Sequence, residues 1–195
     1  ACVSQICTLH SAFETDVAEY AAAACTTLEI WLGKLETYLD THTVDDVRAL
    51  LAEHGMTAPV ASFQGGLLLP DAERRRIHWE HFNRRLELCQ SLGVGTLVVA
   101  ADVEPVSTSS DIDQLLTLLA KAAARAEQSG IRLALEFQSS APFANNLATA
   151  LALVQQCDQP SLGICLDLFH FHAGPSKSED LALLAQENLF HVQLC

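Results

Sequence analysis

Short β-type segments alternate with longer helix-type segments along all 195 residues, and this alternation constrains the fold more than any other feature. A strand–helix–strand rhythm with short connections is typical of the βαβ units that build a parallel sheet. The expected strands are Val3–Leu9, Thr27–Trp31, Thr57–Phe63, Gly95–Ala101, Ile131–Phe137, Ser161–Leu166 and Leu189–Leu194. No linker rich in Pro or Ser interrupts the rhythm, so residues 1–195 are predicted to form a single domain.

Two architectures fit these alternating units, an open doubly wound sheet and a (β/α)8 barrel. A doubly wound sheet usually carries a Gly-rich phosphate loop after its first strand, but no G-x-G-x-x-G occurs anywhere in this sequence. The one glycine pair, Gly65-Gly66, lacks the Lys-Ser/Thr of a P-loop. We therefore predict an α/β fold of the (β/α)8 TIM barrel type.

The charge balance limits the kinds of partner. Acidic residues outnumber basic ones by 24 to 11, which gives a net charge of −13. Because nucleic-acid binding depends on Lys and Arg that neutralise phosphates, no nucleic-acid partner is expected. Half of the residues are apolar, but the richest stretch, Leu147–Val154, is far too short to span a membrane. We therefore expect no membrane partner.

The cysteines bear on the cellular compartment. There are seven of them, an odd number, and none is spaced C-x-x-C, so neither a disulfide framework nor a zinc finger is supported. No basic segment precedes an apolar one at the start, as a signal peptide would require. We therefore predict a reduced, cytoplasmic protein. The first residue is Ala1 rather than Met, which leaves a processed or cut start open.

Polar side chains stand at the C-terminal ends of the expected strands, and in a barrel these ends form the catalytic face. They are His10, Glu29, Gln64, Asp102, Glu136, Asp167, His191 and Gln193. We predict that they surround one pocket. Lys34, just beyond the second strand, is expected to meet a carboxylate or a phosphate there. Trp31 shares a strand face with Glu29, and such an aromatic wall suits either a sugar or packing in the core.

Strand alternation places the acidic groups on the inward face of the barrel. Taken alone, Glu136 suits a salt bridge with an arginine, and Asp167 suits a helix or turn cap. Two inward carboxylates in phase on consecutive strands are better explained by a shared cation, most simply a divalent metal. On the last strand the expected inward residues are His191, Gln193 and Cys195, opposed by Phe190, Val192 and Leu194.

Five arginines gather in one helical segment, interleaved with glutamates. They are Arg74, Arg75, Arg76, Arg84 and Arg85. A solvated helix face is expected here, with a subunit contact as the alternative, so a homo-oligomer stays open.

Three sequence segments resemble a known family. LALEF at 133–137, LDLFHFHAG at 166–174 and FHVQLC at 190–195 are similar to segments of the xylose-isomerase-like (β/α)8 barrels. This sugar phosphate isomerase/epimerase group includes hydroxypyruvate isomerases, ketose 3-epimerases and inosose dehydratases. LEIW at 28–31 and LGVGTLVV at 92–99 add to the resemblance, which spans the whole chain.

The resemblance implies roles for the polar residues of the last three strands. Glu136 matches a metal ligand that often serves as an acid/base group. The D-x-x-H that begins at Asp167 supplies a ligand and, in His170, a catalytic group that contacts substrate. Gln193 takes the place of the third ligand, which is commonly His, and His191 lines the site beside it. The fourth ligand of the family, a Glu that ends the eighth strand, has no counterpart in this sequence.

The family implies a divalent-metal-dependent isomerase or epimerase that acts on a small sugar, polyol or hydroxy-keto acid through an enediolate. Oxygen ligands favour Mn²⁺ or Mg²⁺, with Zn²⁺ and Co²⁺ as alternatives. A dehydratase of the same fold and a non-catalytic, degenerate barrel are the competing hypotheses. An apurinic endonuclease is disfavoured, because its site needs several more His ligands and its substrate needs positive charge.

The number of strands sets a final expectation. The chain supplies seven strands, whereas a barrel of this type needs eight in about 250 residues. We therefore expect that the sequence is incomplete at its C-terminus and lacks the last strand with its metal-binding Glu, or that a neighbouring chain covers the gap.

Overall fold

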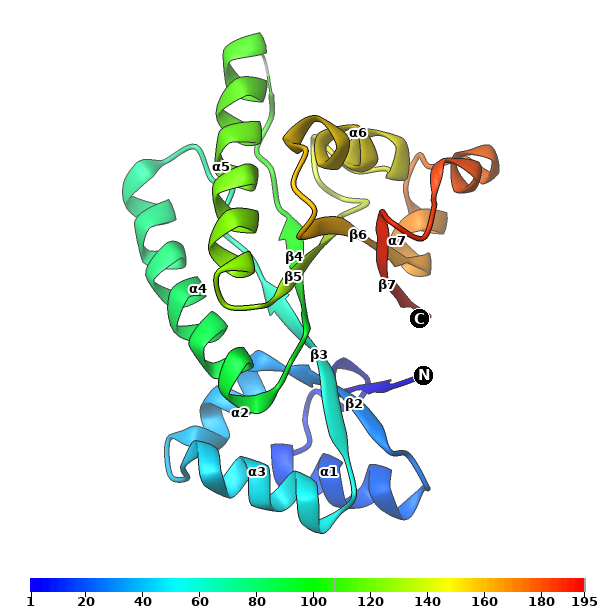
Figure 1. Cartoon of the computed structure of the whole chain (residues 1–195). Helices are drawn as coiled ribbons and strands as arrows, with labels where there is room; N and C mark the ends of the chain where they lie inside the picture. Colours follow the sequence, from blue (N-terminus) through cyan, green and yellow to red (C-terminus); the bar gives the residue numbers. More distant parts are fainter. Residues whose placement is uncertain (107, 195) are drawn as a thin grey trace.

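A computed structural model describes residues 1–106 and 108–194, and its core is a curled sheet of parallel strands (Figure 1). Seven strands lie side by side in sequence order, and every neighbouring pair is parallel. The strands are β1 (Val3–Ser4), β2 (Thr27–Trp31), β3 (Thr57–Gln64), β4 (Thr96–Ala101), β5 (Arg132–Phe137), β6 (Leu162–Asp167) and β7 (Leu189–Gln193). This arrangement confirms the predicted barrel that covers seven βα units and lacks the last strand.

Helices connect the strands and cover the outer face of the curled sheet (Figure 1). The α-helices are α1 (Phe13–Ala22), α2 (Leu32–Leu39), α3 (Val44–Glu53), α4 (Ala72–Leu92), α5 (Ser109–Glu127), α6 (Leu147–Cys157) and α7 (Leu168–Ala173). Two short 3-10 helices are η1 (Gln5–Thr8) and η2 (Ser178–Leu183). In the described part of the chain, no helix is both long and apolar enough to cross a membrane.

Local sequence signals explain where the long helices begin and end. Thr43 starts α3 with a capping box, in which its side chain accepts from the backbone N–H of Asp46. Thr108 and Asp111 form the same device at the start of α5. Such caps satisfy backbone donors that have no partner inside the helix. Helix α4 ends at Gly93, whose φ of +73° favours a residue without a side chain.

The barrel has two separate apolar regions, one on each face of the sheet. The larger core lies between the strands and the surrounding helices, and it includes Leu133, Leu135 and Phe137 of β5. The smaller cluster lies on the inner face of the barrel. It consists of Val60, Val98, Ala134 and Cys165, with Phe190 packed against it. The polar ends of the strands lie above this inner cluster.

The first strand is shorter than the predicted Val3–Leu9. Pairing stops at Ser4, and the chain turns at once into η1. Ser4 caps the 3-10 helix through its side chain, and the side chain of the buried Gln5 binds the backbone N–H of Trp31 and the carboxylate of Asp16. These side-chain hydrogen bonds take the place of a longer β ladder, which the local sequence pattern did not reveal.

The predicted orientation of Phe190 is wrong because β7 contains a bulge. Ile164 pairs with Leu189 but Cys165 pairs with His191, so Phe190 is an extra residue at this point of the ladder. A bulge interrupts the alternation of side chains between the two faces. Phe190 therefore packs on the inner cluster, and the guanidinium carbon of Arg132 lies 4.7 Å from its ring centroid. Cys195, predicted to share the inward face, lies outside the described residues.

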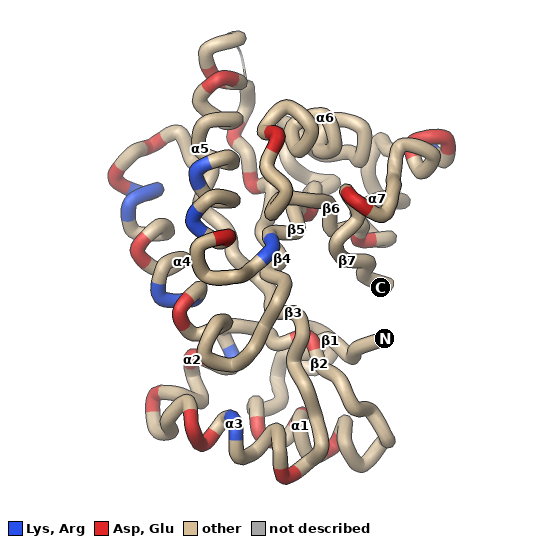
Figure 2. Tube along the Cα trace, viewed as in Figure 1, with Lys and Arg blue, Asp and Glu red and all other residues tan. Residues whose placement is uncertain are grey.

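The arginines of α4 lie in two different environments, one exposed to solvent and one buried. Figure 2 shows basic residues along α4 and α5, interleaved with acidic residues on both helices. Arg76 is exposed and forms ion pairs with Glu73 and Glu80, as expected of a solvated face. Arg85, in contrast, points inward and is buried, with Glu36 of α2 as its partner. The prediction of a solvated face was therefore wrong for Arg85.

We expect that Gly163→Ala destabilises the protein, because a Cβ at this position would lie 2.6 Å from the ring of Phe190. Overpacking of this kind typically lowers the free energy of unfolding by about 1–3 kcal/mol. Urea denaturation followed by circular dichroism measures the loss. Gly95→Ala is the control, since its nearest neighbour would be 3.9 Å away. Equal stability of the two variants would contradict this packing, and Phe190→Leu should partly restore Gly163→Ala.

Candidate functional site

A cavity of about 940 Å³ lies inside the barrel at the C-terminal ends of the strands. Its lining includes six of the polar residues that the sequence singled out. They are Glu29, Glu136, Asp167, His170, His191 and Gln193. Both Cys2 and Val192 also line it, so the cavity reaches the region between the first and last strands. The cavity therefore combines a polar upper end with the apolar interior of the barrel.

Glu136 and Asp167 stand on neighbouring strands and are both buried. Glu136 pairs in register with Cys165, two residues before Asp167, and the side chains are 7% and 5% exposed. Burial, followed by the negative charge of Asp167, raises the pKa of Glu136 to about 7. The side-chain amide of Gln138 donates a hydrogen bond to Glu136 Oε2, which offsets only part of this rise.

Asp167 also caps the following helix. Its Oδ1 accepts a hydrogen bond of 2.9 Å from the backbone N–H of His170, at the first turn of α7. This is the capping role that the residue taken alone suggested. The hydrogen bond holds the carboxylate at the end of β6 and sets the start of the segment that carries His170. The His170 ring is in turn fixed by Ser139, whose Oγ lies 3.1 Å from its Nδ1.

Glu29 of β2 binds side chains from three other strands. Its Oε1 accepts hydrogen bonds from Ser62 Oγ on β3 (2.6 Å), Gln193 Nε2 on β7 (2.8 Å) and Ser4 Oγ on β1 (3.2 Å). Its Oε2 lies 2.7 Å from His191 Nε2. An ionised carboxylate only accepts hydrogen bonds, so this ring nitrogen carries the proton.

The hydrogen bonds outweigh the burial of Glu29. Burial by itself raises the pKa of this carboxyl, but the bonds from His191, Ser62 and Gln193, together with the charge of His191, bring the pKa below its ordinary value. Glu29 and Glu136 thus line one cavity with pKa values shifted in opposite directions. Two carboxyl groups with such different pKa values can act at the same pH as a fixed negative charge, here Glu29, and as a base that gains and loses a proton, here Glu136.

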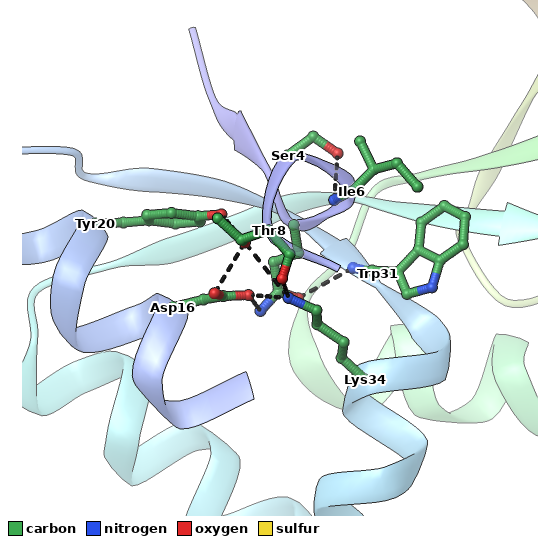
Figure 3. A network of polar contacts seen from close by, with 8 residues as sticks. Ser4, Ile6, Thr8, Asp16, Tyr20, Trp31 and Lys34 are labelled. Carbon is green, nitrogen blue, oxygen red and sulfur yellow. Dashed lines mark hydrogen bonds and ion pairs between the residues drawn. The ribbon is translucent and has the colours of Figure 1, made fainter. Parts of the chain in front are cut away.

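Two predicted pocket residues lie away from this cavity. His10 is exposed in the turn after η1 and is not among the residues that line the interior. Lys34 is buried, and its ammonium forms an ion pair of 2.6 Å with Asp16 of α1. Figure 3 shows the network, in which Thr8 binds both groups. Lys34 does meet a carboxylate, as expected, but this carboxylate belongs to Asp16 of the same chain.

Gln64 and Asp102 line a different cavity. This second cavity, of about 410 Å³, lies between the ends of β3 and β4 and helix α4. The prediction of one common pocket is therefore wrong for these two residues. Trp31 and Phe63 line both cavities, and their rings stack with centroids 5.9 Å apart.

Sequence reasoning missed three polar residues of the interior site. Gln138 lies two residues beyond Glu136, and the alternation of a strand already indicates that they share a face. Ser4 and Ser62 have no comparable signal, because nothing local shows that their hydroxyls reach Glu29. Only the packing of β1 and β3 on either side of β2 places them there.

The residues fit a divalent cation, though they supply an incomplete set of ligands. Two buried carboxylates repel each other, and a cation between them would remove this cost. The Gln193 amide nitrogen donates to Glu29, and its oxygen faces the other way, where it accepts a weak hydrogen bond from Cys165 Sγ at 3.6 Å. Within residues 1–106 and 108–194, no three His, Cys, Asp or Glu side chains converge on a metal position.

A sequence model described as the xylose isomerase-like TIM barrel matches residues 17–195. The chain belongs to this family. A 3-dehydroshikimate dehydratase from Pseudomonas aeruginosa is 30% identical over 76% of this chain and 23% of its own length. An inosose isomerase from Bacillus licheniformis is 26% identical over 78% of this chain and 60% of its own length. This xylose isomerase-like barrel thus spans less than two thirds of either curated relative.

Solved structures support the same fold. The IolI protein, determined with a bound zinc atom, matches with a TM-score of 0.85 and 24% identity over 98% of this chain and 70% of that one. A xylose isomerase domain protein from Salmonella typhimurium matches with a TM-score of 0.82 and 14% identity over 99% and 70% of the two chains. At these identities the likeness establishes the architecture of the xylose isomerase-like barrel.

We expect that Glu136→Gln stabilises the chelator-treated protein at alkaline pH. The pKa of Glu136 is raised from 4.5 to about 7, so the folded state binds a proton that the unfolded state has lost, and stability falls as the pH rises through this range. The variant should gain on the order of 2–3 kcal/mol near pH 8 and almost nothing near pH 5. Urea denaturation at both pH values measures this. Exposed Glu127→Gln is the control, and a gain that does not depend on pH would contradict the assignment.

Glu29→Gln should have the opposite effect. The pKa of Glu29 is lowered in the folded protein, so its stabilising contribution is present above the ordinary value of 4.5 and is lost as the pH falls through the lowered one. An amide accepts fewer of the four hydrogen bonds, and we expect the free energy of unfolding to drop by about 2–3 kcal/mol near pH 7. The loss should shrink at acidic pH, whereas exposed Glu53→Gln should change little at either pH.

Proposed function

We propose that this chain carries the metal and proton-transfer centre of an isomerase or epimerase that acts on a small sugar, polyol or hydroxy-keto acid. The observation that carries the proposal is the pair of buried carboxylates, Glu136 and Asp167, on neighbouring strands in one cavity. Removal of a proton from the carbon beside a carbonyl needs a base whose pKa is near neutral and which lies in a site shielded from water. Burial and the charge of Asp167 place the pKa of Glu136 in that range.

Glu136 removes the proton in the proposed reaction. Its carboxylate takes the hydrogen from the carbon beside the carbonyl, and the electron pair moves onto the carbonyl oxygen to give an enediolate. Return of the proton to the former carbonyl carbon, with transfer of the hydroxyl proton to the former carbonyl oxygen, yields the isomer. Return of the proton to the opposite face of the same carbon yields the epimer. His170 lines the same cavity and is held by Ser139, which suits a residue that contacts the substrate.

The proposed cation site uses Glu136, Asp167 and the side-chain oxygen of Gln193. A bound divalent ion would polarise the substrate carbonyl and stabilise the developing negative charge. Three oxygen ligands favour Mn²⁺ or Mg²⁺, with Zn²⁺ and Co²⁺ as alternatives. Glu29 holds Gln193 and His191 by hydrogen bonds of 2.8 and 2.7 Å, so both side chains are oriented before substrate binds.

A dehydratase is the second candidate, favoured by the relative that is 30% identical. Its first step is the same removal of a proton by Glu136. The two reactions then differ, because the electron pair expels a hydroxyl group from the next carbon, and this group leaves with a proton as water. The interior cavity of about 940 Å³ accommodates either substrate class.

Mn²⁺ binding and hydrogen exchange test the proposal together. Calorimetric titration should show one Mn²⁺ site that is lost in Asp167→Asn and kept in exposed Asp113→Asn. In deuterated buffer with Mn²⁺, NMR of inosose and 3-dehydroshikimate should show deuterium at the carbon beside the carbonyl. Glu136→Gln should slow this exchange at least about 100-fold, while Glu127→Gln should not.

The products distinguish the two candidates. A deuterated isomer or epimer supports the isomerase, and loss of water from 3-dehydroshikimate supports the dehydratase. Mn²⁺ binding that is unchanged in Asp167→Asn would overturn the proposed site. Exchange that persists at full rate in Glu136→Gln would overturn the role of this residue as the base.

A further inference from the structure

The second cavity, next to the interior one, has the features of a ligand site. It has a volume of about 410 Å³ and lies at the C-terminal ends of β3 and β4. Both cavities touch the stacked rings of Trp31 and Phe63, so the two cavities border on each other at this aromatic pair. The residues on which the inference rests are Trp31, Phe63, Gly66, His78 and Asp102.

Among the described residues, one carboxylate oxygen of Asp102 has no hydrogen-bond partner. Its Oδ2 accepts a hydrogen bond of 2.6 Å from the backbone N–H of Gly66. Its Oδ1 is buried and has no hydrogen-bond partner anywhere in the described ranges 1–106 and 108–194. A buried acceptor without a partner destabilises the folded protein, and native proteins rarely keep one without a purpose. A donor from outside the chain would remove this cost.

The loop beside Asp102 is packed so closely that only glycine fits. A Cβ at Gly66 would lie 2.1 Å from the His78 ring, and its φ of +78° also disfavours any other residue. A Cβ at Gly65 would lie 2.8 Å from Asp102 Oδ2. The carboxylate, the loop and the imidazole are therefore held together as one wall of the cavity.

The two arginines of the wall each have an acidic partner in this chain, and Arg74 is paired with Glu104 at 3.6 Å. Arg85 binds both carboxylate oxygens of Glu36 at 2.7 Å, through Nε and Nη2, and His81 lies 2.6 Å from the same carboxylate. Arg85 Nη1 also donates to the backbone oxygen of Phe63 at 2.8 Å. Most N–H donors of Arg85 are therefore already used within this chain, and the negative charge of Asp102 would repel an anion. The atom of this wall that has no hydrogen-bond partner is an acceptor, Asp102 Oδ1. It suits a neutral ligand that donates a hydrogen bond.

We propose that the second cavity binds a neutral polyol, with a hydroxyl group donated to Asp102 Oδ1 and the C–H face of the polyol against Trp31. The inference deepens the proposed function, because the shared aromatic pair would let one polyhydroxylated substrate occupy both cavities, with its reacting carbonyl near Glu136. His78 supplies a ring nitrogen for a second hydroxyl. A substrate with a hydroxylated tail is then favoured over one that ends at the reacting carbons.

Xylitol is the probe, because it has no carbonyl and cannot react. Metal-free, ¹⁵N-labelled protein is titrated with xylitol and followed by NMR. We expect amide signals of Gly65, Gly66 and Asp102 to shift with a saturable dependence. Asp102→Asn keeps the size of the side chain and an oxygen for Gly66, but replaces the free acceptor with a donor. It should weaken binding about tenfold or more, and exposed Asp113→Asn should not.

The outcomes separate this inference from the proposed function. Binding that persists in Glu136→Gln and weakens in Asp102→Asn supports the second cavity even where Mn²⁺ or exchange experiments fail. Shifts confined to residues around Glu136 and Asp167 would overturn it, as would no shift in the wild-type protein. Should Asp102→Asn not fold, as its NMR spectrum would show, His78→Ala provides the test, with weaker xylitol binding expected. Tighter binding of ethylammonium than of xylitol would also overturn the assignment of a polyol.

Discussion

The hydrogen bonds that Glu29 accepts are the interaction on which the rest of the site depends. Ser4, Ser62, His191 and Gln193 come from β1, β3 and β7, so one carboxylate joins the first and last strands across more than 160 residues. A buried carboxylate is costly unless donors surround it, and Glu29 is only 2% exposed. Because β7 pairs with β6 alone among the described strands, these contacts also fix the orientation of its two polar side chains.

Glu29 and Glu136 are the same residue type, but their surroundings give them different pKa values. Glu29 has four donors, and its pKa is lowered despite burial. Glu136 has one amide donor and an acidic neighbour, and burial raises its pKa to about 7. One therefore stays charged and organises the site, while the other is able to exchange a proton near neutral pH. Lys34 and Arg85 show the same rule, because each buried cation is bound to an acid of this chain.

Much of the architecture could be predicted because its signals are local. A period of two along β5 and β6 already places Glu136 and Asp167 on the inward face, and the strand–helix rhythm favours a parallel barrel. The predictions failed at positions whose orientation or burial depends on a residue far away in the sequence. The bulge at Phe190 depends on pairing with β6, and the burial of Lys34 depends on Asp16. Asp102 stands at a strand end as predicted, but it faces a different cavity from Glu136.

The sequence by itself determined the order of strands and helices and the presence of acidic groups at the strand ends. Both follow from hydrophobic periodicity, which neighbouring residues set. Only the tertiary structure decided which carboxylates are satisfied and which are not. Hydrogen-bond partners come from strands far apart in the chain, as His191 does for Glu29 and Gly66 does for Asp102. The chemistry available to each acid is therefore a property of the assembled barrel, because its pKa and its free lone pairs depend on those partners.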